Sequence, residues 1–178
     1  MSRISRDEWG VCLATTTAER GTCLRRKVGC VLVDSVGRVL ATGYNGVARG
    51  LPHCNERVLG EFEEVNLENL EQSGRLTRQV TFPNACPGAF LPSGTGLETC
   101  EAIHAEQNAL LACRDPDAVE TCYITVSPCI HCVKMLMNTG CRRIVFREPY
   151  VHDETARELW WKIQIGEERR QWIHLPAH

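Results

Sequence analysis

Two short motifs in this sequence carry residue types that bind zinc. The first is His104-Ala105-Glu106, and the second spans residues 128–132, where Cys129 and Cys132 stand three positions apart. Each motif begins a helix predicted from the pattern of apolar residues. Two cysteines at this spacing lie on the same side of a first helical turn, so both sulfurs can hold one ion. The helix N-terminus lowers the pKa of a thiol, which favours the thiolates that zinc needs.

His104 completes a set of three protein ligands, which predicts a catalytic zinc. Structural zinc sites are closed by four protein ligands, whereas catalytic sites leave the fourth position for water. Zinc lowers the pKa of that water from about 15.7 to about 7, and a carboxylate such as Glu106 can accept its proton and pass it to a substrate. The alternative is a structural zinc with Glu106 in solvent. His131 is a weaker candidate ligand, because it lies between the cysteines and is expected to point elsewhere.

Helices and strands alternate after an opening hairpin, and this order predicts the fold class. We expect helices over about residues 5–19, 103–113, 129–139 and 153–163. Strands are expected over residues 28–33 and 38–42, which form the hairpin, and over residues 121–126, 143–147 and a last segment that includes 172–175. This order predicts an α/β fold: a three-layer α/β/α sandwich around a mixed sheet of about five strands, parallel in its second half.

The chain is expected to form a single domain over residues 1–178 with a long loop insertion at about residues 44–102. Loops longer than about 12 to 15 residues without their own structure are uncommon in compact domains, so we expect something to fasten this one. Cys54, Cys86 and Cys100 fall near its beginning, middle and end. These cysteines are therefore candidates for fastening the insertion.

Composition excludes several classes of protein. The net charge of −2 in 178 residues argues against binding of a nucleic-acid duplex, and no apolar run approaches the length of a membrane span. The N-terminus lacks the apolar core of a secretory signal, so we expect a cytoplasmic protein, or one of the host cytoplasm if its origin is viral. Eleven cysteines in a reducing compartment favour metal ligands over disulfides. Five others lie in apolar runs and are predicted to be buried: Cys12, Cys30, Cys113, Cys122 and Cys141.

The motif H-x-E followed by P-C-x-x-C is the signature of zinc-dependent deaminases. Over about residues 5–150 the sequence resembles the deoxycytidylate (dCMP) deaminases of bacterial and phage type, within the cytidine deaminase-like superfamily. The zinc motifs are common to that superfamily, whereas Gly-Tyr-Asn-Gly and Pro-His-Cys narrow the resemblance to the nucleotide enzymes. The segments that carry it are residues 23–29, 43–46, 52–54, 103–110, 125–129 with Cys132, and 148–150.

The resemblance implies a hydrolase acting on an amidine C–N bond, which converts dCMP to dUMP and ammonia and supplies the precursor of dTMP. It implies that Glu106 protonates N3 of the base and then the departing ammonia. The backbone N–H of Ala105 and the carbonyl of Ser127 would orient the base, and Asn45 would bind the deoxyribose. Arg25, Arg26 and Tyr150 match positions near the 5′-phosphate. The plainer alternatives are a solvated arginine pair, an Asn-Gly turn and a packed tyrosine.

The resemblance also implies a second, structural zinc and regulation by nucleotides. Cys23 and Cys54 match two of its ligands, and Cys86 and Cys100 are the available thiols; His53 competes with Cys23 for the fourth place. The alternative is unpaired loop cysteines. The family is typically hexameric, activated by dCTP with Mg²⁺ and inhibited by dTTP. The effector loop would consist of Gly43, Tyr44, Asn45 and Gly46.

Two alternative functions stay open at this stage. A deaminase of bases in RNA or DNA needs a basic, aromatic-lined channel for the strand, which 20 basic against 22 acidic residues do not favour. A non-catalytic module that binds zinc or nucleotide is disfavoured by the presence of Glu106. We therefore expect a small-molecule nucleotide substrate, with neither nucleic acid nor membrane as a partner. The motifs do not decide whether dCTP is also a substrate.

Overall fold

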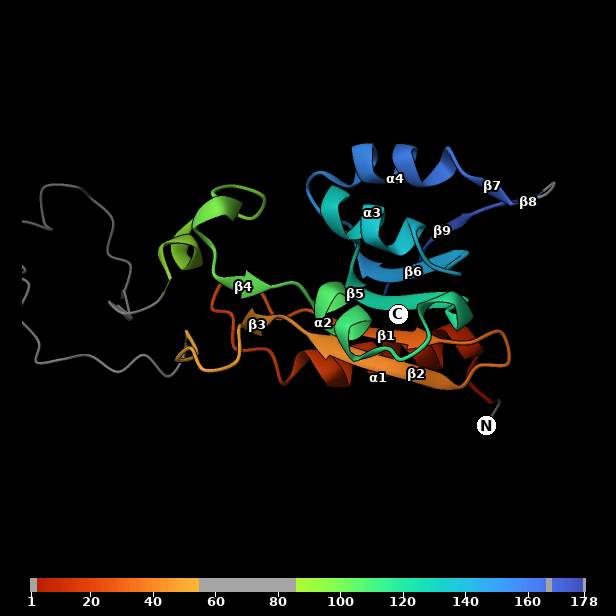
Figure 1. Cartoon of the computed structure of the whole chain (residues 1–178), viewed down its shortest axis with the longest axis horizontal. Helices are drawn as coiled ribbons and strands as arrows, with labels where there is room; N and C mark the ends of the chain where they lie inside the picture. The colour runs from red at the N-terminus through yellow and green to blue at the C-terminus, as the bar shows by residue number, and fades with distance from the viewer. Residues whose placement is uncertain (1–2, 55–85, 166–167, 178) are drawn as a thin grey trace, which may run out of the picture.

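The computed structural model describes residues 3–54, 86–165 and 168–177 of the chain. Its centre is a five-stranded sheet in the order β2-β1-β5-β6-β9 (Figure 1). The strands are β1 (Gly29–Val33), β2 (Val39–Tyr44), β5 (Thr121–Val126), β6 (Arg143–Glu148) and β9 (Gln171–His174). β1 pairs antiparallel with β2 and β5, whereas β5–β6 and β6–β9 are parallel. The predicted mixed sheet with a parallel second half is confirmed.

Helices cover both faces of this sheet, and this confirms the three-layer architecture. The helices are α1 (Arg6–Ala18), α2 (Ala105–Ala112), α3 (Ile130–Met137) and α4 (Asp153–Trp161). On one face, Val11 and Ala14 of α1 pack on Val31, Tyr123 and neighbouring apolar residues. The other face carries a larger core, in which α2, α3 and α4 cover the sheet (Figure 1). Within the described ranges no helix has the length and apolar character of a membrane span.

Local sequence explains where α1 begins. Ser5 and Glu8 form a capping box: the Glu8 N–H donates to Ser5 Oγ over 3.1 Å, and the Ser5 N–H donates to Glu8 Oε2 over 2.7 Å. Only one face of α1 meets the sheet, so the predicted burial of Cys12 is wrong; its thiol is exposed. Cys113, at the end of α2, is only partly buried. Cys30, Cys122 and Cys141 are buried as predicted.

Short elements complete the part of the insertion that the structure describes. β3 (Gly46–Val47) pairs antiparallel with β4 (Ala102–Ile103), and this pairing joins the two ends of the insertion. Between them lie two short 3₁₀ helices, η3 (Pro87–Phe90) and η4 (Leu97–Thr99), while residues 55–85 are outside the described part. A third such helix, η5 (Pro116–Ala118), precedes β5, and a small hairpin of β7 (Gln164–Ile165) and β8 (Glu168–Arg169) precedes β9. The β3–β4 ladder has no counterpart among the elements predicted from the sequence.

A carboxylate on α1 ties this helix to the sheet and carries a testable prediction. Asp7 accepts hydrogen bonds from Tyr123 Oη over 2.9 Å and from Arg143 Nη2 over 2.8 Å. Asp7→Ala leaves both donors without this partner, so we expect the free energy of unfolding to fall by about 1 to 3 kcal/mol. Urea denaturation measures the change. Glu154→Ala is the matched control, because its 3.9 Å ion pair with Arg157 is exposed; a loss as large as that of Asp7→Ala would contradict the assignment.

Candidate active site

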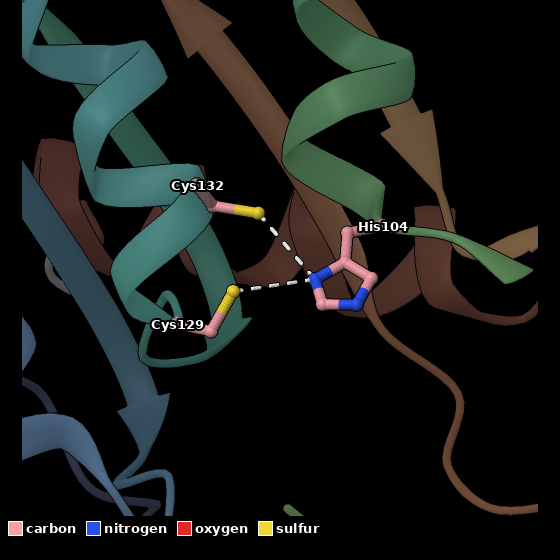
Figure 2. A group of neighbouring side chains, drawn as sticks. All are labelled: His104, Cys129 and Cys132. Atoms are coloured by element: carbon pink, nitrogen blue, oxygen red, sulfur yellow. Dashed lines mark hydrogen bonds between the residues drawn. The ribbon is translucent and has the colours of Figure 1, made fainter. Parts of the chain in front are cut away.

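The three predicted zinc ligands meet where two helices begin side by side. His104 is the N-cap residue of α2, and Cys129 is the N-cap residue of α3, with Cys132 in the first turn of the latter. Figure 2 shows the two sulfurs directed at one edge of the imidazole ring. His104 Nδ1 lies 3.5 Å from Cys129 Sγ and 3.4 Å from Cys132 Sγ. The local spacing of each motif and the approach of α2 to α3 together build this group.

These distances fit a tetrahedral zinc ion. With Zn–S bonds of about 2.3 Å and a Zn–N bond of about 2.0 Å, a tetrahedral angle separates nitrogen from sulfur by about 3.5 Å. The three ligand atoms all lie within 4.8 Å of one another. No other three His, Cys, Asp or Glu ligand atoms in the described part of the chain gather this closely. The donor set of one imidazole and two thiols suits zinc and leaves a fourth position open.

The surroundings prepare the sulfurs to bind a cation. Hydrogen bonding from the Cys132 thiol, and then from His104, lowers the pKa of Cys129 to about 3. Cys129 and Cys132 are both buried, with 8% and 0% of their surface exposed. Because only the thiolate is a good metal ligand, this arrangement supplies one at neutral pH.

Glu106 stands beside the three ligands as a buried acid. It lies in the first turn of α2, only 4% of its surface is exposed, and it lines the same cavity as His104 and Cys129. Burial raises its pKa to about 7, against the opposing effect of His104. A carboxyl group with this pKa can both accept and donate a proton near neutral pH, as a general acid and base requires.

A cavity opens beside these groups. Seven of the predicted catalytic and substrate-binding residues line it: Arg25, Arg26, Asn45, Ala105, Glu106, Ser127 and Tyr150. They come from five separate parts of the chain, and the fold brings them to one place. Of the predicted effector loop, only Asn45 is among the residues that line the cavity.

Asn45 and Arg25 also make contacts inside the protein. Asn45 Nδ2 donates to the carbonyl of Arg26 over 2.7 Å, and the Val28 N–H donates to Asn45 Oδ1 over 2.8 Å. Asn45 therefore shapes the chain that carries both arginines. Arg25 Nη1 donates to the carbonyl of Thr95 over 3.1 Å, and Nη2 donates to that of Gly88. In the described part of the chain, the Arg26 side chain makes no hydrogen bond or ion pair with protein.

Two features of the site were not predicted from the sequence. Asp153, the first residue of α4, accepts a hydrogen bond from Ser127 Oγ over 3.5 Å, while Ser127 Oγ accepts one from the Tyr150 N–H over 2.7 Å. Residues 93, 94 and 97 of the insertion form part of the cavity wall. The sequence carries no signal for either feature. The hydrogen bonds join distant segments, and the insertion lacks the periodicity from which its position could be predicted.

The cysteines of the insertion gather in a second group next to the cavity. Cys54 and Cys86 are buried, with 1% and 0% of their surface exposed, and Cys100 packs against them. A hydrogen bond from Cys100 lowers the pKa of Cys23 to about 5. No three of these four sulfurs lie within 4.8 Å of one another. His53 Nδ1 lies 3.2 Å from Thr22 Oγ1.

Comparisons with known proteins agree on one family for this chain. Residues 4–148 match the family model described as the cytidine and deoxycytidylate deaminase zinc-binding region. The deoxycytidylate deaminase of Mycobacterium phage D29 is 35% identical over 147 residues, which are 82% of this chain and 97% of that protein. The deoxycytidylate deaminase of Saccharomyces cerevisiae is 34% identical over 158 residues, or 88% of this chain. The chain spans less than half the length of this relative and of its counterpart in Schizosaccharomyces pombe.

Solved structures share the fold. The apo dCMP deaminase of cyanophage S-TIM5 superposes with a TM-score of 0.59 at 20% identity, over 98% of this chain and all of that one. The structure of that enzyme in complex with dCMP and dUMP gives a TM-score of 0.56 at 22% identity, over 89% of this chain and 95% of that one. These matches support the predicted three-layer fold.

Proposed function

This chain belongs to the cytidine and deoxycytidylate deaminase family, and from that membership we propose that it hydrolyses dCMP to dUMP and ammonia. The reaction breaks an amidine C–N bond, and its product is the precursor of dTMP. The observation that carries the proposal is the buried Glu106 beside a three-ligand metal site, in a cavity that all the predicted substrate-binding residues line. The phage D29 relative, which this chain matches along almost its whole length, is named for the same activity.

His104, Cys129 and Cys132 hold the zinc in this proposal. When bound, zinc supplies a water whose pKa is lowered towards about 7. Glu106 would take a proton from that water and deliver it to N3 of the base, while the water oxygen would bond to C4. Glu106 would then take a second proton, from the hydroxyl now on C4, and pass it to the exocyclic nitrogen. The C4–N bond would break, ammonia would leave with the bonding electrons, and the C4 oxygen would become the carbonyl of dUMP. Burial keeps the pKa of Glu106 where both transfers are feasible.

The remaining cavity residues orient the nucleotide. The N–H of Ala105 and the carbonyl of Ser127 hold the base, and Asn45 binds the deoxyribose. Arg26 and Tyr150 face the 5′-phosphate, where a guanidinium can form two parallel charge-assisted hydrogen bonds, and Arg25 lies beside them in the cavity wall. Arg26 is the strongest candidate of the three, because its side chain has no described protein partner.

Comparison of substrates tests this assignment. With zinc bound, we expect dCMP to lose its cytosine absorbance and release ammonia, with kcat/KM about 100-fold above that of deoxycytidine, since a charge-assisted contact contributes up to about 3 kcal/mol. A single-stranded oligonucleotide is expected to react little. Equal turnover of nucleoside and nucleotide would refute the proposed phosphate contacts. Faster turnover of the oligonucleotide than of dCMP would favour a deaminase of bases in RNA or DNA instead.

We propose a structural zinc held by Cys23, Cys54, Cys86 and Cys100, with His53 as the alternative fourth ligand. The burial of Cys54 and Cys86 beside Cys100 supports this assignment. The metal would draw the sulfurs together and fasten the insertion at residues 44–102 to a single domain of residues 1–178.

Metal analysis tests the second site. We expect about two zinc ions per chain in the native protein and about one in Cys86→Ser, because serine rarely replaces a thiolate as a zinc ligand. The exposed Cys12 supplies the control, since Cys12→Ser should keep both ions. One zinc per chain in the native protein, unchanged in Cys86→Ser, would refute the proposal.

Regulation and assembly follow the family in this proposal. The protein would form a hexamer in the cytoplasm, or in the host cytoplasm if it is viral. dCTP with Mg²⁺ would activate it, and dTTP would inhibit it. The loop of Gly43, Tyr44, Asn45 and Gly46 would take the effector. Asn108 Nδ2 donates to the carbonyl of Tyr44 over 2.8 Å and so connects this loop to the helix that carries Glu106.

A further inference from the structure

Arg25 makes two bonds that a phosphate ligand does not need. Its Nη1 and Nη2 donate to the carbonyls of Thr95 and Gly88, which lie 70 and 63 residues away along the chain. Its Nε is buried with no hydrogen-bond partner in the described part of the chain. Two of the five donors of the guanidinium are thus committed to the insertion. Arg25 itself lines the substrate cavity.

The segment that Arg25 holds is a wall of that cavity. Ser93, Gly94 and Leu97 line it, and Gly94 has a φ of +86°. A Cβ at Gly94 would lie 2.8 Å from both His152 Nε2 and Val151 Cγ2. Residues 92–97 therefore contact both Arg25 and the residues that follow Tyr150, which also lines the cavity.

Little else fastens this wall through hydrogen bonds. The bonds made by residues 92–99 among themselves are local turns, such as Thr95 N–H to the Pro92 carbonyl over 3.1 Å and Thr99 N–H to the Gly96 carbonyl over 3.1 Å. Within the described residues, Arg25 donates the only long-range hydrogen bonds that residues 87–99 receive. Two glycines at positive φ make such a segment costly to order. Charge-assisted bonds to its carbonyls reduce the entropy lost when a substrate binds.

We propose that Arg25 is a positioning residue that holds residues 92–97 in place as a preformed wall of the substrate pocket. Only the kinetic consequence of this role depends on the proposed deaminase function. The wall faces every substrate that enters the cavity, whether or not it carries a phosphate. A loosened wall therefore weakens the binding of nucleoside and nucleotide alike, and this separates positioning from phosphate ligation.

Hydrogen–deuterium exchange on the zinc-loaded protein tests the positioning directly, without activity. In Arg25→Gln we expect the peptide that covers residues 88–99 to exchange about 10-fold faster, since two charge-assisted bonds are lost. Arg26→Gln is the matched control and should leave that peptide unchanged, and Arg25→Lys should give an intermediate rate. Unchanged exchange in Arg25→Gln overturns the proposal, even if the native protein deaminates dCMP.

Kinetics provides the second arm. Arg25→Gln is expected to raise KM for dCMP and for deoxycytidine by a similar factor of about 10, with a smaller change in kcat, whereas Arg26→Gln should affect dCMP alone. A defect of Arg25→Gln confined to dCMP would make it a phosphate ligand and overturn the positioning role. If Arg25→Gln fails to fold, Gly94→Val replaces it in the test, because it displaces the same wall at its contact with His152. A similar rise in KM for both substrates would support the proposal, and a defect confined to dCMP would overturn it. Absence of deaminase activity in the native protein would refute the proposed function and leave the exchange result valid.

Discussion

Glu106→Gln is expected to lower kcat for dCMP by about 10²- to 10⁴-fold, the range that general acid–base catalysis contributes. Glutamine matches the size of glutamate and fits the same buried position, but it cannot take up and return a proton. The buried carboxyl group of Glu106, with its pKa raised to about 7, lies beside the metal ligands and is suited to both transfers. Loss of absorbance by dCMP and release of ammonia measure the effect.

The zinc content of this variant separates catalysis from metal binding. Glu106 is not among the three ligands, so Glu106→Gln should keep the zinc of the native protein. Gln107 provides a matched control on the same helical turn, since its Oε1 accepts a hydrogen bond from the His104 N–H over 2.9 Å without proton transfer. Gln107→Glu keeps this acceptor, so we expect far less effect on kcat. Undiminished turnover in Glu106→Gln would remove Glu106 from the proposed mechanism.

Cys132→Ser is expected to remove the catalytic zinc and to reduce deamination below detection. Serine is a poor ligand for zinc, and the Cys132 sulfur is fully buried 3.4 Å from His104 Nδ1, where no solvent-exposed group can replace it. With the structural zinc in place, metal analysis should fall from about two ions per chain to one. Chelation of the native protein should abolish turnover in the same way, and added zinc should restore the native protein but not the variant.

Cys141→Ser controls for the loss of a buried thiol. Cys141 is as buried as Cys132, but it lies outside the ligand group and its Sγ donates to the Arg143 carbonyl over 3.3 Å. We expect it to retain zinc and turnover, with at most a loss of stability. Full zinc content and normal turnover in Cys132→Ser would show that the metal is held elsewhere, and the proposed mechanism would fail with it.

Much of this site could be predicted from the sequence because its chemistry lies in local spacing. Cysteines three positions apart at a helix start face one way in any protein, and His104 with Glu106 begins the other helix. The strands and helices that carry them also follow from short-range periodicity, and strand 121–126 has the predicted bounds. The order of these elements in turn restricts the topology, because parallel strands need helical crossovers.

Contacts between distant segments account for the rest. Three contacts join residues far apart in the chain, and no pattern of neighbouring residues encodes them. They are the hydrogen bonds of Arg25 to the insertion, the hydrogen bond from Ser127 to Asp153, and the β3–β4 pairing. Cys12 was misplaced for the same reason, since which face of a helix meets a sheet depends on the packing. The pKa of Glu106 is raised by burial, which the residue type alone does not determine. Short-range spacing specifies which groups this protein has for its chemistry, whereas long-range packing sets their solvation, their partners and the walls around them.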